Sequence, residues 1–194
     1  ADGSTGVAEF LKSRAQFTAD LRQKFDKAGS YADMYKLIGQ ELWVASRLLD
    51  SANPEYVRSG MGLAFSASQH ALNEAQNGWV AARICEGYLL PHLDVADDTN
   101  RRSQFNRDNL LTECADIFRR NNEYPGVIRT YQTALATADT PQKADSARAQ
   151  ISMACEQAGD LKQALRYIRE IKDTNDFRWV VRRAPRLEQQ LKAH

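Results

Sequence analysis

One sixteen-residue segment, RICEGYLLPHLDVADD (Arg83 to Asp98), gathers most of the residue types that could do chemistry. Cys85 and His92 are a thiol and an imidazole, the pair that a cysteine nucleophile and its general base require. Seven residues of helix would place their Cα atoms about 10 Å apart along the helix axis, with Pro91 between them. A hydrogen bond cannot cross that distance unless the chain folds back, so we expect no Cys–His catalysis in this segment.

The same segment offers a second chemistry, because His92 is followed by three carboxylates that could hold a metal ion: Asp94, Asp97 and Asp98. The run lacks the glycine and the spaced glutamate of a calcium-binding loop. A solvated acidic connection is therefore the preferred interpretation, and we predict no metal site. An enzyme or metal site between Cys85 and Asp98 remains the less favoured alternative.

Elsewhere the chain carries none of the common catalytic motifs: no Gly-x-Gly-x-x-Gly, no P-loop, no H-E-x-x-H and no G-x-S-x-G. Its three cysteines, Cys85, Cys114 and Cys155, are spaced by 29 and 41 residues and include no C-x-x-C pair. That spacing fits no zinc or disulfide framework, so we expect three free thiols in the core. His70 is expected on the surface or in a groove. The sequence thus predicts a protein that is not an enzyme, with no catalytic residue and no cofactor.

The net charge of +1 on 194 residues provides no global field for nucleic acid or an anionic membrane. Residues 1–100 carry 9 Lys/Arg against 13 Asp/Glu, a net charge of −4, and residues 101–194 carry 17 against 12, a net charge of +5. One arginine stripe, Arg178, Arg182 and Arg186, could contact an anion, but no second basic surface accompanies it. We expect no nucleic-acid partner, and no apolar run approaches the length of a membrane span.

The chain begins Ala1-Asp2-Gly3 without Met. That start fits a mature protein exported to the periplasm of a bacterium, or a domain cut from a longer, otherwise cytoplasmic chain. The sequence does not choose between these two localisations.

Helical periodicity runs through nearly the whole chain, because apolar residues recur at intervals of three and four. Breaks at Gly29, Asn77, Asn122 and Gly159 are spaced by 48, 45 and 37 residues, and each one splits a helical hairpin. A loose period of this size is typical of stacked helix-turn-helix units. We therefore predict an all-α fold, with about eight helices arranged as an α-solenoid in one domain spanning residues 1–194. The expected hairpins are residues 5–50, 54–96, 102–139 and 141–173, with a C-terminal cap at 176–193.

Several helix starts are marked by a capping residue. Asn53-Pro54, Thr140-Pro141 and Asp160 each place a cap directly before an apolar stripe. Asp176 is expected to cap the C-terminal piece in the same way.

The last two hairpins resemble tetratricopeptide repeats. In ARAQISMACEQAGDLKQALRYIREI (147–171), Cys155, the Gly159–Leu161 turn and Ala164 stand at the positions where that family packs its two helices. The preceding unit is similar, although Val127 stands where the family has an alanine. The resemblance covers residues 108–172 and is weak over 1–100.

The resemblance implies a concave groove that is lined by the first helix of each repeat and receives a peptide or a partner helix. Its lining would be Asn109, Thr112, Asp116 and Arg119 from one repeat, and Ser146, Ala149, Met153 and Glu156 from the next. We accordingly expect a non-catalytic domain for protein–protein interaction or assembly that binds a protein or peptide partner. Self-association through an exposed end or helix face, as a weak homo-oligomer, is the alternative.

Overall fold

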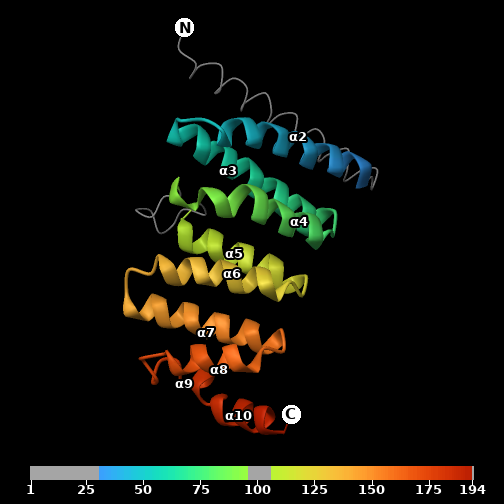
Figure 1. The fold of residues 1–194 in the computed structure, drawn as a ribbon. Helices are drawn as coiled ribbons and strands as arrows, with labels where there is room; N and C mark the ends of the chain where they lie inside the picture. Colours follow the sequence, from blue (N-terminus) through green and yellow to red (C-terminus); the bar gives the residue numbers. More distant parts are fainter. Residues whose placement is uncertain (1–30, 96–105, 194) are drawn as a thin grey trace. The chain divides into compact units, whose positions relative to one another are not determined.

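The computed structural model describes residues 31–95 and 106–193 (Figure 1). Within these ranges all regular structure is helical and no strand occurs, which confirms the predicted all-α class. The first part of the expected hairpin 5–50, up to residue 30 and including the break at Gly29, lies outside the described residues, as do Asp97 and Asp98. The chain divides into two compact units, residues 1–95 and 96–194, which are treated separately below.

The described part of unit 1, residues 31–95, contains three consecutive helical segments, two of which change their winding before they end. The segments are α2 (Tyr31–Leu49), then α3 (Pro54–Gln69) continued by the π-helix η1 (His70–Glu74), then α4 (Gly78–Ile84) continued by the π-helix η2 (Cys85–Leu89) and the 3-10 helix η3 (Leu90–Val95). α2 packs along α3, and α4 follows on α3. The predicted helix start at Asn53 is confirmed, because its side-chain oxygen accepts a hydrogen bond from the backbone N–H of Glu55 at 2.9 Å. Asn77 caps α4 in the same way through Val80 N at 3.1 Å.

Unit 2 is a run of antiparallel helices in which each helix packs mainly on its neighbours in sequence (Figure 1). They are α5 (Arg107–Arg120), α6 (Tyr124–Ala136), α7 (Pro141–Gln157), α8 (Leu161–Arg169), α9 (Arg178–Val181) and α10 (Ala184–Lys192). The predicted cap Thr140 accepts from Lys143 N at 3.2 Å, and Asp160 accepts from Gln163 N at 3.0 Å. Gly159 has a φ of +83°, the left-handed conformation expected of the residue after a helix end.

The close packing of α5 on α6 depends on a glycine rather than on the alanine that the tetratricopeptide pattern favours. A Cβ atom added at Gly126 would lie 2.5 Å from Cδ1 of Phe118, whose ring is fully buried. Val127 beside it is also completely buried. The small residue that lets the two helices approach therefore stands one position before the site expected from the repeat pattern.

The C-terminal cap forms, although Asp176 does not begin it. α9 starts at Arg178 behind Phe177, with no side-chain cap, so the prediction for Asp176 is wrong. Asp173 takes that role in the preceding turn, where its Oδ1 accepts from Asn175 N at 3.0 Å and from Asp176 N at 3.1 Å. Figure 1 shows α9 and α10 following α8 at the end of the chain.

Apolar side chains anchor this cap to the rest of unit 2. Val180 and Leu187 are fully buried in the same cluster as Ile151, Cys155 and Ile168. The cap therefore belongs to the core of unit 2, and unfolding it would expose that cluster.

The turn after α8 is held by one buried carboxylate. Asp145 on α7 is 1% exposed, and its Oδ2 accepts from the backbone N–H groups of Lys172 and Asp173 at 3.0 and 2.9 Å. Its Oδ1 accepts from Arg148 Nη1 at 2.7 Å. Burial alone would raise the pKa of Asp145, but these hydrogen bonds and the guanidinium charge outweigh burial and lower it.

Candidate functional site

A hollow of about 200 Å³ opens between α5, α6 and α7 in unit 2. Its polar lining residues are Asp108, Thr112, Tyr131, Thr137, Lys143 and Ser146, and its apolar ones are Leu111, Ala134, Ala138 and Ala147. Two of the residues predicted for the groove, Thr112 and Ser146, therefore lie in one concave surface. Small side chains on α6 and α7 keep this space open, because larger ones would fill it.

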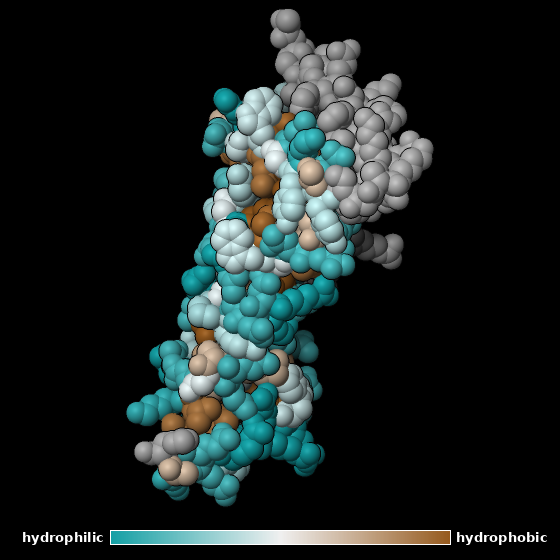
Figure 2. All heavy atoms as spheres, turned by 90° about the vertical axis from the view of Figure 1, so that its right-hand side faces the viewer, coloured by the Kyte–Doolittle hydropathy of each residue, from teal (hydrophilic) through white to brown (hydrophobic). Residues whose placement is uncertain are grey.

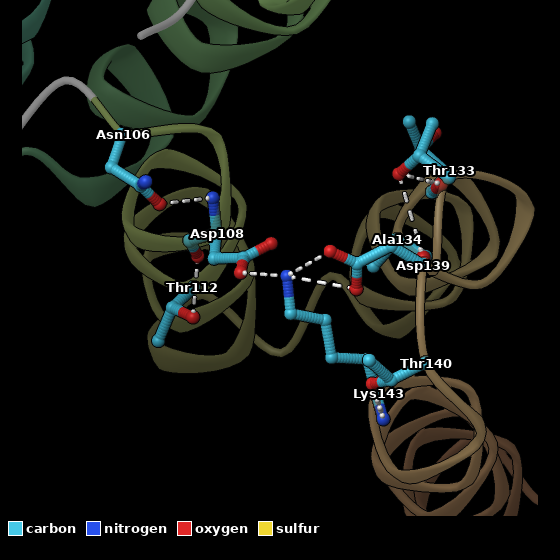
Figure 3. Close-up of polar contacts among 9 residues, drawn as sticks. Asn106, Asp108, Thr112, Thr133, Ala134, Asp139, Thr140 and Lys143 are labelled. Carbon is cyan, nitrogen blue, oxygen red and sulfur yellow. Dashed lines mark hydrogen bonds and ion pairs between the residues drawn. The ribbon is translucent and has the colours of Figure 1, made fainter. Parts of the chain in front are cut away.

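An ion-paired cluster stands at the rim of this hollow (Figure 3). Lys143 Nζ lies 3.0 Å from Oδ2 of Asp108 and 3.1 Å from Oδ1 of Asp139, so one ammonium group joins two carboxylates. The helix starts position these groups: Asn106 caps α5 through Asp108 N at 2.9 Å, and Thr140 caps α7 through Lys143 N. Hydrogen bonds to the two carboxylates, first to Asp108 and then to Asp139, raise the pKa of Lys143.

Further along α5, the predicted groove residues Asp116 and Arg119 are partly buried and pair with each other at 2.5 Å. Arg119 also donates to Oε1 of Gln150 at 3.1 Å, which joins α5 to α7 across the groove. Burial raises the pKa of Tyr131, against the opposing hydrogen bond from Arg119. Asn109, by contrast, is exposed at the start of α5.

On α7, the residues predicted for the groove have different environments. Ser146 is exposed in the hollow, and Met153 is partly buried. Glu156 pairs with Arg186 and, at 2.6 Å, with Arg183, so the C-terminal cap occupies this carboxylate. Ala149 is 1% exposed and faces the core, which contradicts its expected place in the groove.

Along this face, then, the open space lies at the Lys143 end, because Arg119 and Gln150 bridge the middle and Glu156 is already occupied. Sequence reasoning missed Asp108, Asp139, Lys143 and Tyr131. The i, i+4 spacing of Asp139 and Lys143 could have indicated their pairing. Nothing in the sequence alone brings Asp108 to Lys143, since the two residues lie on different helices.

Unit 1 contains a second polar cluster, and it is buried. Glu41 on α2 is 1% exposed, with Oε2 at 2.9 Å from Nδ1 of His70 and Oε1 accepting from Ser66 Oγ at 3.0 Å. His70 is 6% exposed, so the expectation that it lies on the surface or in a groove is wrong. Since the Ser66 hydroxyl is bonded to the carboxylate rather than to the imidazole, the cluster lacks the nucleophile–base contact of a hydrolase. It joins α2 to the end of α3.

The Cys85–His92 region is split between two kinds of helix. Cys85 is fully buried in η2, and His92 is partly exposed at a kink inside η3, with a φ of −115° and a ψ of 19°. Cys114 and Cys155 are also buried free thiols, and burial together with the charge of Asp160 raises the pKa of Cys155 to about 11. Across residues 31–95 and 106–193, no three His, Cys, Asp or Glu side chains gather into a possible metal site.

No helix within the described part of the chain is both long and apolar enough to cross a membrane. Comparison with known proteins does not assign the chain to a family, because no family model, curated protein or solved structure matches it. The functional argument therefore depends on the residues and their geometry alone.

Proposed function

We propose that this chain is a non-catalytic protein-interaction module, a tetratricopeptide-like α-solenoid that binds an extended peptide segment of a partner across α5 and α7. One observation carries the proposal: the hollow between α5, α6 and α7 contains Thr112 and Ser146, two residues that the resemblance assigns to the peptide groove. A surface cavity of about 200 Å³ would accept a single side chain of a peptide rather than a drug-sized molecule, which needs roughly 300–1,000 Å³.

The chemistry of the hollow supports a mixed polar and apolar ligand side chain. Leu111 and three alanines supply apolar contact, and the hydroxyl groups supply hydrogen-bonding partners. Lys143 with Asp108 and Asp139 gives the rim a net charge of −1, so a peptide with a positive or amide group at the mouth is favoured. The rest of the peptide would lie along the polar face toward Arg119.

Site-specific photocrosslinking tests this proposal. A photoreactive amino acid at Ser146 should capture a partner from the source cell, whereas the same group at the exposed Thr174 should not. Ser146→Trp fills the hollow from an exposed position and should abolish capture by a photoreactive group placed at Thr112. Thr174→Trp, the matched control, should leave capture unchanged. Equal capture from Thr112 in Ser146→Trp and in the parent protein would contradict the proposal.

Two further variants separate groove binding from self-association. Asp116→Arg and Arg119→Glu each reverse one charge on the groove face and should weaken partner capture without unfolding the domain. Light scattering of the purified chain gives its mass in solution, and a stable dimer that these variants dissolve would favour the self-associating alternative.

A further inference from the structure

A second concave surface lies between α8 and α10 and shares no residue with the hollow at Lys143. Two adjoining hollows of about 520 and 470 Å³ meet there, with Lys162 and Leu191 in both. The remaining lining residues are Leu165, Arg169, Glu188 and Lys192 in the larger, and Ala158, Gly159, Asp160 and Leu161 in the smaller. Figure 2 shows brown, apolar surface at the lower end of unit 2, where α8 begins and α10 ends.

The apolar lining residues Leu161, Leu165 and Leu191, called the apolar strip below, are not fully covered because α10 packs on only part of α8. Ala164 and Ile168 on α8 are buried in the core of unit 2, and Leu187 is the fully buried contact of α10. Leu161 and Leu191 are only partly buried. Apolar side chains gathered in a surface hollow favour the packing of a further apolar surface on them.

The charges around the strip are unbalanced. Arg169 pairs with Glu188 at 2.7 Å across the two helices, and the carboxylate of Asp160 is engaged as the cap of α8. Lys162 on α8 and Lys192 on α10 are both exposed, and neither makes an ion pair with any residue in the described ranges. Two ammonium groups, one from each helix, therefore flank the apolar strip.

We propose that this surface, in which Leu161 and Leu191 are partly exposed beside the buried Leu165 (5% exposed) and between Lys162 and Lys192, binds an amphipathic helix of a partner protein that carries carboxylates beside its apolar stripe. The apolar side chains on α8 extend from residue 161 to residue 165, about 6 Å at 1.5 Å per residue, and the lining of the hollow continues to Arg169, about 12 Å in all, which matches two turns of a partner helix. Leucine-like side chains at i, i+3 or i+4 and i+7 would enter the strip. Glutamates beside them would meet the two lysines, which sets the orientation and speeds association.

Fluorescence anisotropy with two synthetic peptides on the full chain tests this proposal. Both are fluorescein-labelled and helix-stapled, with leucines at i, i+3 and i+7; one carries glutamates beside the stripe and the other carries lysines at the same positions. The Glu peptide should bind at least 10-fold more tightly than the Lys peptide. Leu191→Asp should weaken binding of the Glu peptide at least 10-fold, because it places a charge in the strip.

A charge reversal separates recognition from a structural effect. The double variant Lys162→Glu, Lys192→Glu should reverse the preference, so that the Lys peptide binds more tightly, whereas loss of fold would weaken both peptides. Lys172→Glu, at an exposed lysine outside the strip, should leave the preference unchanged. Equal affinity for the two peptides, or an unreversed preference in the double variant, overturns the proposal.

Two outcomes identify a different occupant or a different site. Light scattering that shows a dimer of the parent chain and a monomer of Leu191→Asp would assign the strip to a second copy and overturn the proposal. Ser146→Trp should leave the affinity of the Glu peptide unchanged, and loss of binding in that variant would place the peptide in the other hollow. Since the two surfaces share no residue, either proposal can fail while the other stands.

Discussion

Replacing Asp145 with Ala is expected to destabilise unit 2 more than any other single carboxylate change within residues 106–193. The substitution removes the acceptor of two backbone N–H groups, from Lys172 and Asp173, and the partner of the Arg148 guanidinium. Each neutral hydrogen bond contributes about 1 kcal/mol and one to a charged group about 1.5–3 kcal/mol. Since the Arg148 side chain is 20% exposed and water can reach the turn, we expect a loss of about 2–3 kcal/mol in the free energy of unfolding at pH 7.

The effect should depend on pH with a definite sign. The folded-state pKa of Asp145 is lowered, so its stabilising contribution is present above the unfolded-state pKa, near 4, and is lost as pH falls through the folded-state pKa below that. The difference in stability between the parent chain and Asp145→Ala should therefore be constant from pH 7 to about pH 5. It should shrink steadily from there toward pH 2.

Urea denaturation measures this difference best when unit 2 is observed alone. Trp179 lies in unit 2, and replacing the exposed Trp43 and Trp79 of unit 1 with Phe leaves it as the only tryptophan emission. Asp176→Ala, at an exposed aspartate nearby, is the matched control and should change the unfolding free energy by less than about 0.5 kcal/mol. A loss below 1 kcal/mol for Asp145→Ala, or one that is equal at pH 7 and pH 3, would refute the reasoning.

Three further outcomes follow from the packing. Gly126→Ala should lower the unfolding free energy by about 1–2 kcal/mol in urea denaturation, because its Cβ meets the buried Phe118 ring and the overpacking exceeds the gain in helix propensity. Glu41→Ala should destabilise unit 1 by about 2–4 kcal/mol. Glu41→Gln should destabilise it by less, because the amide can still form hydrogen bonds with His70 and Ser66. The thiols should resist Ellman's reagent at pH 8 in the native state and react fully in 6 M guanidinium, because burial and a pKa of about 11 leave roughly one Cys155 in a thousand ionised.

Each of these outcomes has a control within the chain. Gly39→Ala, where nothing lies within 4 Å of the added Cβ, should leave stability unchanged or raise it by up to about 1 kcal/mol. If it destabilises as much as Gly126→Ala, contact with Phe118 is not the cause. Ser46→Ala, at a partly exposed position on the same helix as Glu41, should have little effect. Fast labelling of Cys85 alone in the native protein would contradict its burial and would favour the alternative of an enzyme site between Cys85 and Asp98.

Local signals predicted the helices well. Asn53, Thr140 and Asp160 all cap the helices that they are expected to start, because capping depends on backbone groups only two or three residues away. Asn77, expected only as a break between helices, also caps α4. Asp176 does not cap a helix because α9 begins two residues later, at Arg178, and the carboxylate that accepts backbone N–H groups in the preceding turn is that of Asp173.

Features that depend on contacts between helices could not be predicted in this way. The burial of His70 has no local signal in the sequence, because its hydrogen-bonding partner Glu41 lies 29 residues earlier in the chain. Lys143 was overlooked for the same reason, since Asp108 lies on another helix. The sequence predicts Glu156 in an open groove, because no local pattern shows that Arg183 and Arg186 pair with it.

The order of packing in unit 2 has a consequence for how the chain is made. Because α6 packs on α5, α7 on α6 and α8 on α7, most contacts join segments that are synthesised close together in time. Such low contact order favours fast folding, and helices can dock on their predecessors as they leave the ribosome. The final cluster around Ile151, Val180 and Leu187 closes only when α9 and α10 emerge. α9 and α10 therefore complete this core after the helices before them have emerged, and a ribosome that stalls before α9 would leave the apolar side chains of the cluster open to water.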